Sequence, residues 1–253
     1  MPFFLRRRNH SLTENIDHPD IDAPKLKRTY QQLEGVNRLF LNTRQIYQAI
    51  IKPTTRACEQ PISVLDVGCG GGDVLISLTS YFEADGIPVR GTGIDPDPRA
   101  IEFADSRNQT RSCRFLCASA ADMRGSDEKY DVVISSHVVH HLPAEELPQF
   151  LEDLKCLAFR CAVVLDIRRS DLSYGLFRTF GSLLFPDSYT VVDGLTSIKR
   201  SYTPQEVGRF ASGEWNVQRM FPFHFICAFQ ATSEEALYGR ERVVCDQLEA
   251  RRA

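Results

Sequence analysis

Residues 64–73 read Val-Leu-Asp-Val-Gly-Cys-Gly-Gly-Gly-Asp, and they join an apolar run to a stretch with helical spacing. The run Ile62–Val67 is short, apolar and partly β-branched, which is typical of a buried parallel strand. Gly68, Gly70 and Gly72 follow at once. Because they lack a Cβ, they let the backbone turn sharply and approach a ligand closely. The segment therefore predicts a strand, a bare loop and a helix, with a ligand at the loop.

A second acidic residue indicates the kind of ligand. Asp95 closes the next strand-like stretch, Val89–Asp95, where a carboxylate can accept hydrogen bonds from both hydroxyls of a ribose. The dinucleotide fingerprint G-x-G-x-x-G/A fails on the loop, because its third small residue falls on Asp73. A carboxylate at a helix N-terminus would repel a pyrophosphate. We therefore expect an adenosine derivative without phosphate groups.

The loop resembles the first motif of the class I S-adenosylmethionine-dependent methyltransferases. That motif is D/E-x-G-x-G-x-G, and residues 66–72 meet it in full. The chain is most similar to the small-molecule members of types 11 and 12, which include ubiquinone-biosynthesis enzymes. The resemblance implies S-adenosyl-L-methionine as cofactor and S-adenosyl-L-homocysteine as product. A nucleotide-binding loop of another Rossmann-like protein, or a structural glycine turn, is the alternative interpretation.

Other motifs of the family follow in order. Many small-molecule members hold the adenine with a Gly-Asp-Ala segment after the third strand, and a Phe-Asp pair and a His-His-Leu come later. Residues 115–120, 130–131 and 140–142 stand at these places. Ser119 replaces the common Asp, so the adenine amine would meet a hydroxyl. The resemblance implies cofactor contacts from Asp66, Gly68, Cys69, Gly70, Asp95, Pro96, Ser119, Ala120, Ser136 and His137.

The order of apolar segments predicts one α/β domain. Strand-like runs alternate with helical stretches, as in a parallel sheet; the runs are residues 62–67, 89–95, 113–117, 131–135 and 161–167. A β-hairpin of residues 214–220 and 223–229 is expected to complete the sheet. Together with the resemblance, this predicts a Rossmann-like, mostly parallel seven-stranded sheet with helices on both faces, an antiparallel C-terminal hairpin and a helical N-terminal lid.

The segments around this core are expected to cover it. Apolar residues at three- and four-residue spacing in residues 33–50 predict an amphipathic helix that ends before Pro53. Thr203-Pro204-Gln205-Glu206 predicts a helix start with a capping box. The single domain 1–253 is expected to consist of an N-terminus that is mobile or draped on the surface (1–20), a helical lid (21–52), a core (60–232) with a substrate cover (170–200), and a C-terminal helix (233–253).

The predicted cover is more aromatic than a surface connector requires. We expect Phe177, Phe180 and Phe185 to bind an apolar or aromatic acceptor. Alternatively, these rings pack only against the core or a second subunit, and both interpretations can hold together. A homodimer is left open.

A histidine pair and an aspartate suggest how an acceptor would be activated. A hydroxyl acceptor must lose its proton, and a histidine whose other nitrogen is held by a carboxylate is suited to take it. Some natural-product O-methyltransferases that the chain resembles use such a pair. The resemblance therefore implies His140 as base, Asp166 as its partner and His141 as the substitute. Alternatively, a histidine only packs beneath the loop, and Asp166 pairs with Arg168 or Arg169.

We expect in-line transfer of a methyl group to a small apolar or aromatic acceptor, a hydroxyl oxygen of a phenolic natural product. A carbon methyltransferase acting on a quinone or phenol ring would carry the same motifs. A noncatalytic, cofactor-binding regulatory protein is the alternative of another class, and the intact glycines and Asp95 disfavour it. Nucleobase amine methylation is disfavoured because residues 135–138 lack the Asn/Asp-Pro-Pro-aromatic motif.

Composition and charge indicate which partners and sites the protein is expected to lack. The chain has 253 residues, 43% of them hydrophobic, and a formal net charge of −3, which argues against a nucleic-acid partner. It contains no run of about 18 apolar residues, so we expect no membrane span and a cytoplasmic protein. The eight cysteines form no C-x-x-C pair, so we expect reduced thiols and no metal site.

Overall fold

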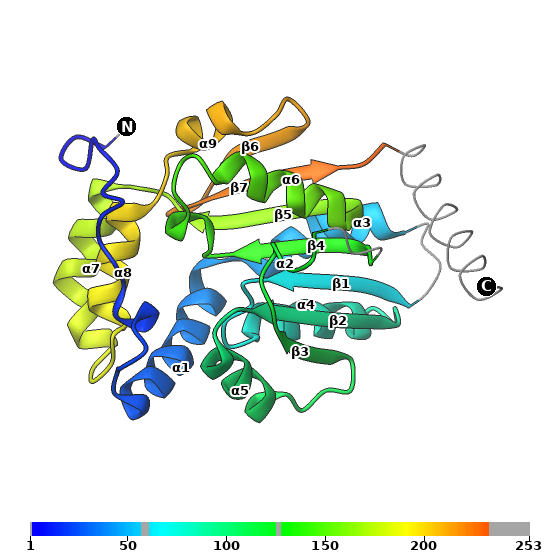
Figure 1. Ribbon diagram of the computed structural model, residues 1–253, viewed down its shortest axis with the longest axis horizontal. Helices are drawn as coiled ribbons and strands as arrows, with labels where there is room; N and C mark the ends of the chain where they lie inside the picture. The colour runs from blue at the N-terminus through cyan, green and yellow to red at the C-terminus, as the bar shows by residue number, and fades with distance from the viewer. Residues whose placement is uncertain (1, 57–60, 125–127, 233–253) are drawn as a thin grey trace.

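The computed structural model describes residues 2–56, 61–124 and 128–232, which fold around a seven-stranded sheet (Figure 1). The strand order is β3-β2-β1-β4-β5-β7-β6. Strand β7 runs antiparallel to β5 and β6, and the strands from β3 to β5 are parallel to one another. The strands are β1 (Ile62–Val67), β2 (Val89–Asp95), β3 (Cys113–Cys117), β4 (Tyr130–Ser136), β5 (Ala158–Ile167), β6 (Trp215–Met220) and β7 (His224–Gln230).

Helices cover both faces of the sheet (Figure 1). Leu75 and Phe82 of α4 are buried on one face, and Leu147 and Leu154 of α6 on the other. The helices are η1 (Asn15–Asp17), α1 (Ala23–Phe40), α2 (Thr43–Ile46), η2 (Tyr47–Ile51), α3 (Lys52–Thr55), α4 (Asp73–Ala84), α5 (Pro98–Arg107), η3 (Val139–His141), α6 (Leu147–Leu157), α7 (Asp171–Leu184), α8 (Thr190–Arg200) and α9 (Pro204–Phe210). No helix among the described residues has the length and apolarity to cross a membrane.

The strand predictions are confirmed apart from small shifts in their bounds. Both hairpin strands begin one residue later than expected, and β5 begins at Ala158 rather than at Cys161. The register between β4 and β5 shifts at the beginning of β5. Such an irregularity interrupts the alternation of inward- and outward-facing side chains by which a strand is recognised in a sequence. The capping box at Thr203 and Glu206 is confirmed. The predicted C-terminal helix lies outside the described residues.

The prediction of one helix over residues 33–50 is wrong. Helix α1 ends at Phe40, and Asn42 then adopts a left-handed conformation with φ 49°, which asparagine tolerates better than most residues. Pro53 does not end the helical region but lies inside α3. A π-helical turn, η2, directly precedes α3, so the chain there departs from the α-helical bonding that proline would disrupt.

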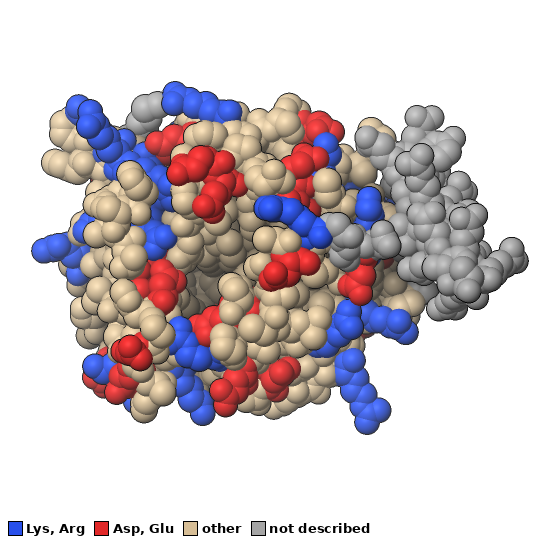
Figure 2. Space-filling view, in the orientation of Figure 1, with Lys and Arg blue, Asp and Glu red and all other residues tan. Residues whose placement is uncertain are grey.

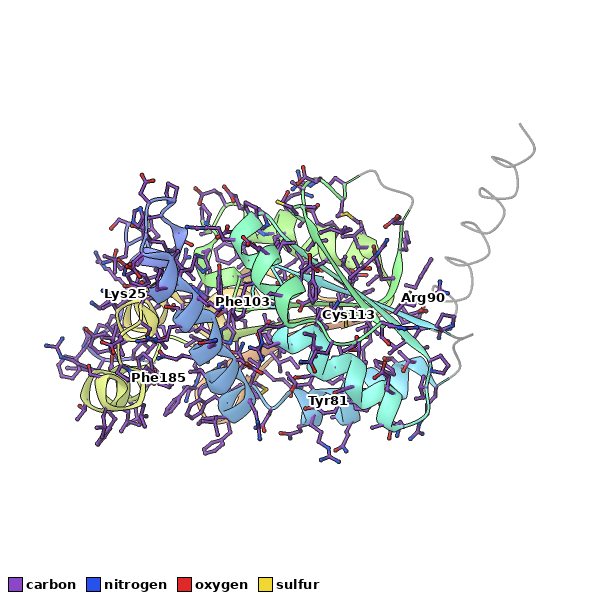
Figure 3. The ribbon with its side chains drawn as sticks, turned by 90° about the horizontal axis from the view of Figure 1, so that it is seen from below. Lys25, Tyr81, Arg90, Phe103, Cys113 and Phe185 are labelled. Carbon is purple, nitrogen blue, oxygen red and sulfur yellow. The ribbon has the colours of Figure 1, made fainter. Side chains whose placement is uncertain are left out.

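The carboxyl ends of the parallel strands are covered by α1, α7, α8 and the chain's beginning (Figure 1). We call residues 8–18 the N-terminal segment. Asn15 donates from its backbone and its side chain to Asp193 of α8, at 2.8 and 2.7 Å. Figure 3 shows Phe103 of α5 beside α1, where its ring stacks on Tyr30 at 5.1 Å. Figure 2 shows a hollow beside these strand ends, with acidic and basic side chains interspersed around it.

Candidate active site

The glycine loop between β1 and α4 is shaped for close approach. Gly68 has φ +71°, and a Cβ built there would lie 2.3 Å from Cγ2 of Val138. Gly70 has φ +50° and has open space where its Cβ would be. Its N–H donates to Oδ2 of Asp95 at 2.9 Å, and the N–H of Asp97 donates to Oδ1 at 2.9 Å. Since a carboxylate has about four lone-pair sites, Asp95 can still accept hydroxyl donors.

Asp66 is a buried carboxylate without a partner. Its side chain is 0% exposed, and neither oxygen has a hydrogen-bond partner among the described residues. Burial raises its pKa well above the usual range, and the nearby Asp73 and Asp95 raise it further. An unpaired buried carboxylate costs free energy until a cation satisfies it. The three acids therefore make the loop a site for a cationic ligand and an unfavourable one for a phosphate.

The other predicted cofactor residues lie around this loop or at the neighbouring strand ends. The thiol of Cys69 is buried against Gly93, which agrees with a packing role for the side chain. The hydroxyl of Ser119 donates to Asp122 at 2.6 Å, so only its lone pairs are left for a ligand amine. Pro96 follows β2, Ala120 lies partly buried beyond β3, and Ser136 and His137 lie at the end of β4.

The structure brings His140 and Asp166 together. Nδ1 of His140 lies 2.8 Å from Oδ1 of Asp166, and the backbone N–H of His140 donates to Oδ2 at 2.9 Å. Burial would lower the histidine pKa, but the charge of Asp166 and hydrogen bonds to two carboxylates raise it to about 10. Burial would raise the aspartate pKa, but His140 lowers it to about 2. The two arginines that were the alternative partners of Asp166 donate to other groups. Arg168 donates to the carbonyl of Pro222. Arg169 donates to the carbonyls of Leu5 and Ser201 and to the carboxylate of Glu206.

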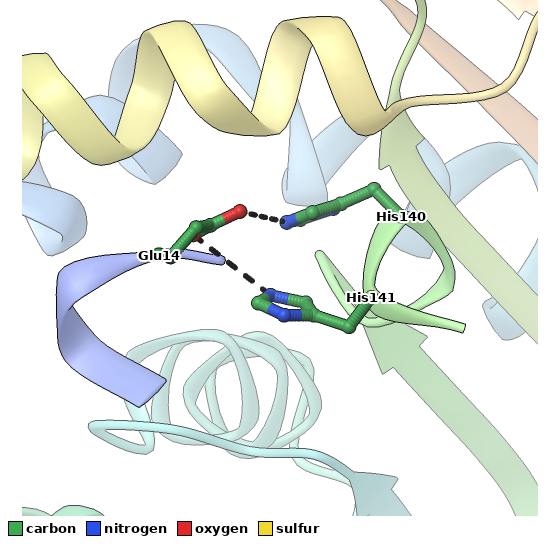
Figure 4. A group of neighbouring side chains, drawn as sticks. All are labelled: Glu14, His140 and His141. Atoms are coloured by element: carbon green, nitrogen blue, oxygen red, sulfur yellow. Dashed lines mark ion pairs between the residues drawn. The ribbon is translucent and has the colours of Figure 1, made fainter. Parts of the chain in front are cut away.

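Glu14 is a site residue that the sequence did not indicate. It lies in the N-terminal segment and is 3% exposed. Its Oε1 lies 3.3 Å from Nε2 of His140 (Figure 4). The same oxygen accepts a hydrogen bond from Ser197 of α8 at 2.8 Å. Burial would raise its pKa, but the bond to His140 lowers it. The N-terminal segment therefore places a buried carboxylate against the histidine that we expected to be the base.

His141 is held in a similar way. Its Nε2 lies 3.9 Å from Oε2 of Glu14 (Figure 4). Its Nδ1 lies 3.4 Å from Oδ2 of Asp17. Arg8 donates to the carbonyl of His140 at 2.9 Å, and Arg200 donates to that of His141 at 3.1 Å. These contacts fix the loop that carries both histidines. The loop, residues 137–142, is called the histidine loop below.

Two further histidines meet beside Asp166. His137 has φ 58°, and its Nδ1 lies 3.9 Å from Oδ1 of Asp166. Burial lowers its pKa to about 4 and that of His224 to about 3. The two rings are 5.4 Å apart, because β7 pairs His224 with Ile167. The predicted hairpin includes His224 near the start of its second strand. It does not specify that this strand pairs with β5, and this pairing brings His224 to Asp166.

The predicted acceptor residues lie on or near α7. The rings of Phe177 and Phe185 are 5.9 Å apart, and Phe177 packs against Gly194 of α8. Phe180 is 53% exposed, so its ring lines no closed site in this arrangement. A role for these rings in acceptor binding stays a prediction.

Comparisons with known proteins agree with this geometry. Residues 64–158 match the family model of a methyltransferase domain. This range contains the glycine loop, Asp95 and the histidine loop. Over this range the chain is similar to class I S-adenosylmethionine-dependent methyltransferases. The cofactor of the family is S-adenosylmethionine, and its cationic groups fit the unpaired Asp66.

Sequence relatives match the chain only in part. A probable phthiotriol/phenolphthiotriol dimycocerosates methyltransferase of Mycobacterium ulcerans is 33% identical over 92 residues, which are 36% of this chain and 33% of the relative. A mitochondrial ubiquinone biosynthesis O-methyltransferase of Schizosaccharomyces pombe is 28% identical over 164 residues, 60% of this chain and 56% of the relative. The matched part spans about a third of the length of the first of these curated relatives.

Solved structures show the same fold. The plantazolicin methyltransferase BpumL, in complex with S-adenosylhomocysteine, has a TM-score of 0.61 at 16% identity, covering 85% of this chain and 92% of that one. This agreement extends beyond the matched domain. It confirms the predicted α/β fold with its antiparallel C-terminal strands.

Proposed function

We propose that the protein transfers a methyl group from S-adenosylmethionine to a hydroxyl oxygen of a small apolar or aromatic acceptor. The observation that carries this proposal is that two features share one edge of the sheet. The unpaired carboxylate of Asp66 lies beside the glycine loop at the end of β1, and the His140–Asp166 pair lies at the ends of β4 and β5. Ligands of open α/β sheets bind at this edge.

The cofactor would be held by the loop and its acids. Asp66 would receive the ammonium group, Asp95 the ribose hydroxyls, and Ser119 and Ala120 the adenine. When bound, S-adenosylmethionine supplies an electrophilic methyl group on a sulfonium sulfur, which is a good leaving group. The protein's task is to hold the acceptor oxygen in line with this methyl group, and such alignment can lower the barrier by several kcal/mol.

Asp95→Ala is expected to weaken cofactor binding by about ten- to hundredfold, because a charge-assisted hydrogen bond contributes on the order of 1.5–3 kcal/mol. Part of the loss would come from the loop, since Asp95 also accepts from Gly70 and Asp97. Asp95→Asn keeps the shape and one acceptor oxygen, so it should lose less. Calorimetric titration with S-adenosylmethionine and with NAD measures both effects. Unchanged affinity, or tighter binding of NAD, would contradict the assignment.

The acceptor proton would go to Nε2 of His140 as the oxygen–carbon bond forms and the carbon–sulfur bond breaks. Asp166 holds the other nitrogen, which fixes the ring and stabilises the imidazolium that results. In the structure Glu14 lies against Nε2, and the contacts of His140 with two carboxylates raise its pKa, which favours a proton on Nε2 that is shared with Glu14. The acceptor must therefore replace Glu14, and this proton must leave with the Glu14 carboxylate before Nε2 can take the proton of the acceptor. Movement of the N-terminal segment would free the base and open the site together.

The acceptor class rests on the relatives and on the cover. The relatives include an O-methyltransferase of ubiquinone biosynthesis and a probable phthiotriol/phenolphthiotriol dimycocerosates methyltransferase. Phe177 and Phe185 form an aromatic pair, and Phe177 packs against α8, the helix whose Ser197 donates to Glu14. The test is a profile with methyl-labelled cofactor against phenols, quinones, sugars, carboxylic acids and amines. We expect label on a phenolic oxygen. Label on ring carbon or nitrogen, with phenolic oxygens unlabelled, would reject the proposed acceptor while leaving the family assignment unchanged.

A further inference from the structure

We propose that Glu14, His140 and His141 form a binding site for a divalent transition-metal ion, which ties the N-terminal segment to the histidine loop. The three side chains come from two segments that are far apart in the sequence (Figure 4). Each offers one ligand atom, and these atoms all lie within 4.8 Å of one another. The occupant would be an ion such as Zn²⁺ or Co²⁺.

The spacing of the donor atoms suits one central ion. Glu14 lies 3.3 Å from Nε2 of His140 and 3.9 Å from Nε2 of His141. Two ligands that each lie about 2.0–2.2 Å from a tetrahedral zinc ion are roughly 3.4 Å apart. The longer distance exceeds a hydrogen bond, so the two side chains do not satisfy each other directly. An ion between the three ligand atoms, which lie within 4.8 Å of one another, would satisfy them all as they move toward this separation.

The outer contacts of both histidines are those of metal ligands. A histidine that binds a metal usually donates its other ring N–H to a carboxylate or carbonyl, which orients the ring. Nδ1 of His140 is held by Asp166 at 2.8 Å, and Nδ1 of His141 lies 3.4 Å from Asp17. Both Nε2 atoms therefore face the same glutamate, and both Nδ1 atoms face other carboxylates. This arrangement leaves two imidazoles aimed at one carboxylate.

The charge around the cluster favours a dication. Three carboxylates, those of Glu14, Asp17 and Asp166, face the two rings. Arg200 contributes one positive charge beside Asp17, at 3.5 Å. Arg8 contributes another at the carbonyl of His140, at 2.9 Å. The three carboxylates outnumber the two guanidinium groups, and this excess of negative charge favours a cation at a place where Glu14 and His140 are each only 3% exposed.

The donor set selects the kind of ion. Two imidazoles and one carboxylate suit zinc, cobalt, nickel or ferrous iron, whereas magnesium and calcium prefer oxygen ligands. Three protein ligands leave a coordination position for water. The ion would occupy Nε2 of His140, the atom to which the proposed function assigns the acceptor's proton. Bound metal would therefore inhibit methyl transfer, and this consequence alone rests on the proposed function.

The experiment is a titration of the full chain, treated with a chelator and then dialysed, with Co²⁺ alone. We expect one ion per chain, visible absorption typical of nitrogen and oxygen ligands, and a higher melting temperature. Glu14→Gln and His141→Gln should each remove this spectrum. Asp17→Asn keeps all three ligands and should weaken binding by about ten- to hundredfold, as loss of a carboxylate behind a ligating histidine does. His10→Gln, at an exposed position of the same segment, is the matched control.

Two results would overturn the metal site. One is a cobalt spectrum with strong thiolate charge-transfer bands, which would indicate adventitious binding to cysteines. The other is cobalt affinity that is the same in all variants as in the parent protein. Methyl transfer is then assayed with and without Co²⁺. Inhibition that a chelator reverses supports both proposals, whereas binding without inhibition rejects His140 as the base and leaves the metal site standing.

Discussion

His140→Ala is expected to lower kcat by about 10²–10⁴-fold, which is the usual contribution of a positioned general base. Affinity for S-adenosylmethionine should stay nearly constant, because the ring lies at the ends of β4 and β5 and not in the glycine loop. The measurement is steady-state kinetics on chelator-treated protein with the acceptor found by labelling. Since the change leaves Asp166 and Glu14 facing a cavity, His140→Gln is measured beside it, and the melting temperatures of both are compared with the parent.

The partner of His140 provides the decisive comparison. Asp166→Asn keeps the shape but removes the charge that supports the imidazolium, so it should reduce kcat less than His140→Ala does. The double variant should be much less than additive if the two residues act as one unit. Full activity in both single variants would reject the pair as base and leave alignment of the acceptor as the means of catalysis.

Asp66→Asn is expected to change stability and cofactor binding in opposite directions. The cofactor-free protein should become more stable, because the substitution removes a buried charge without a partner. Affinity for S-adenosylmethionine should fall by roughly 30- to 4000-fold, since loss of one partner of a buried charge pair costs about 2–5 kcal/mol. Thermal unfolding without cofactor and calorimetric titration with it measure the two effects.

Asp131→Asn is the matched control for this variant. Asp131 lies on the adjacent strand β4 and is also 0% exposed, but its carboxylate accepts from the N–H and the hydroxyl of Ser63 at 2.9 and 2.8 Å. This control should lose stability and keep its cofactor affinity. If Asp66→Asn also lost stability while binding S-adenosylmethionine normally, Asp66 would be a structural residue.

The raised pKa of Asp66 gives both effects a pH dependence. A carboxyl group whose pKa is raised by folding stabilises the protein below its unfolded pKa, and this contribution is lost as the pH rises through the folded pKa. The stability advantage of Asp66→Asn should therefore appear only above about pH 4, the ordinary pKa of an aspartate. Cofactor affinity of the parent should rise with pH as the carboxyl group ionises, and Asp66→Asn should show no such rise.

The core of the fold could be predicted because its signals are local. An apolar run and three glycines specify β1, the loop and the start of α4, and Asp95 is found from the end of the next run. The helical region after residue 40 could not be predicted in this way. Its apolar spacing continues smoothly through Leu41 and Ile46, and only the left-handed backbone at Asn42 interrupts it. Helices α1 and α2 both contact α4 on the two sides of this break, and such packing is not visible in a periodic pattern.

The candidate site could be predicted only where its residues follow strands. His140 and Asp166 come after β4 and at the end of β5, so the topology of a parallel sheet places them together. Glu14 and Asp17 lie in a polar stretch without periodicity, and nothing in the sequence indicates that one of them is buried. Their positions depend on long-range contacts such as those of Asn15 with Asp193. His224 reaches the site only through the pairing of β7 with β5.

The two ligand sites differ in where along the chain their residues come from. The glycine loop, Asp66 and Asp95 all lie within residues 64–158, the range that matches the family model. Glu14, Asp166 and helices α7 and α8 lie outside it. If the proposed function holds, the cofactor site is built from one continuous stretch of sequence, whereas the acceptor site combines the histidine loop of that stretch with residues on both sides of it. Changes confined to the flanking stretches would then alter the choice of acceptor and leave the binding of the methyl donor as it is.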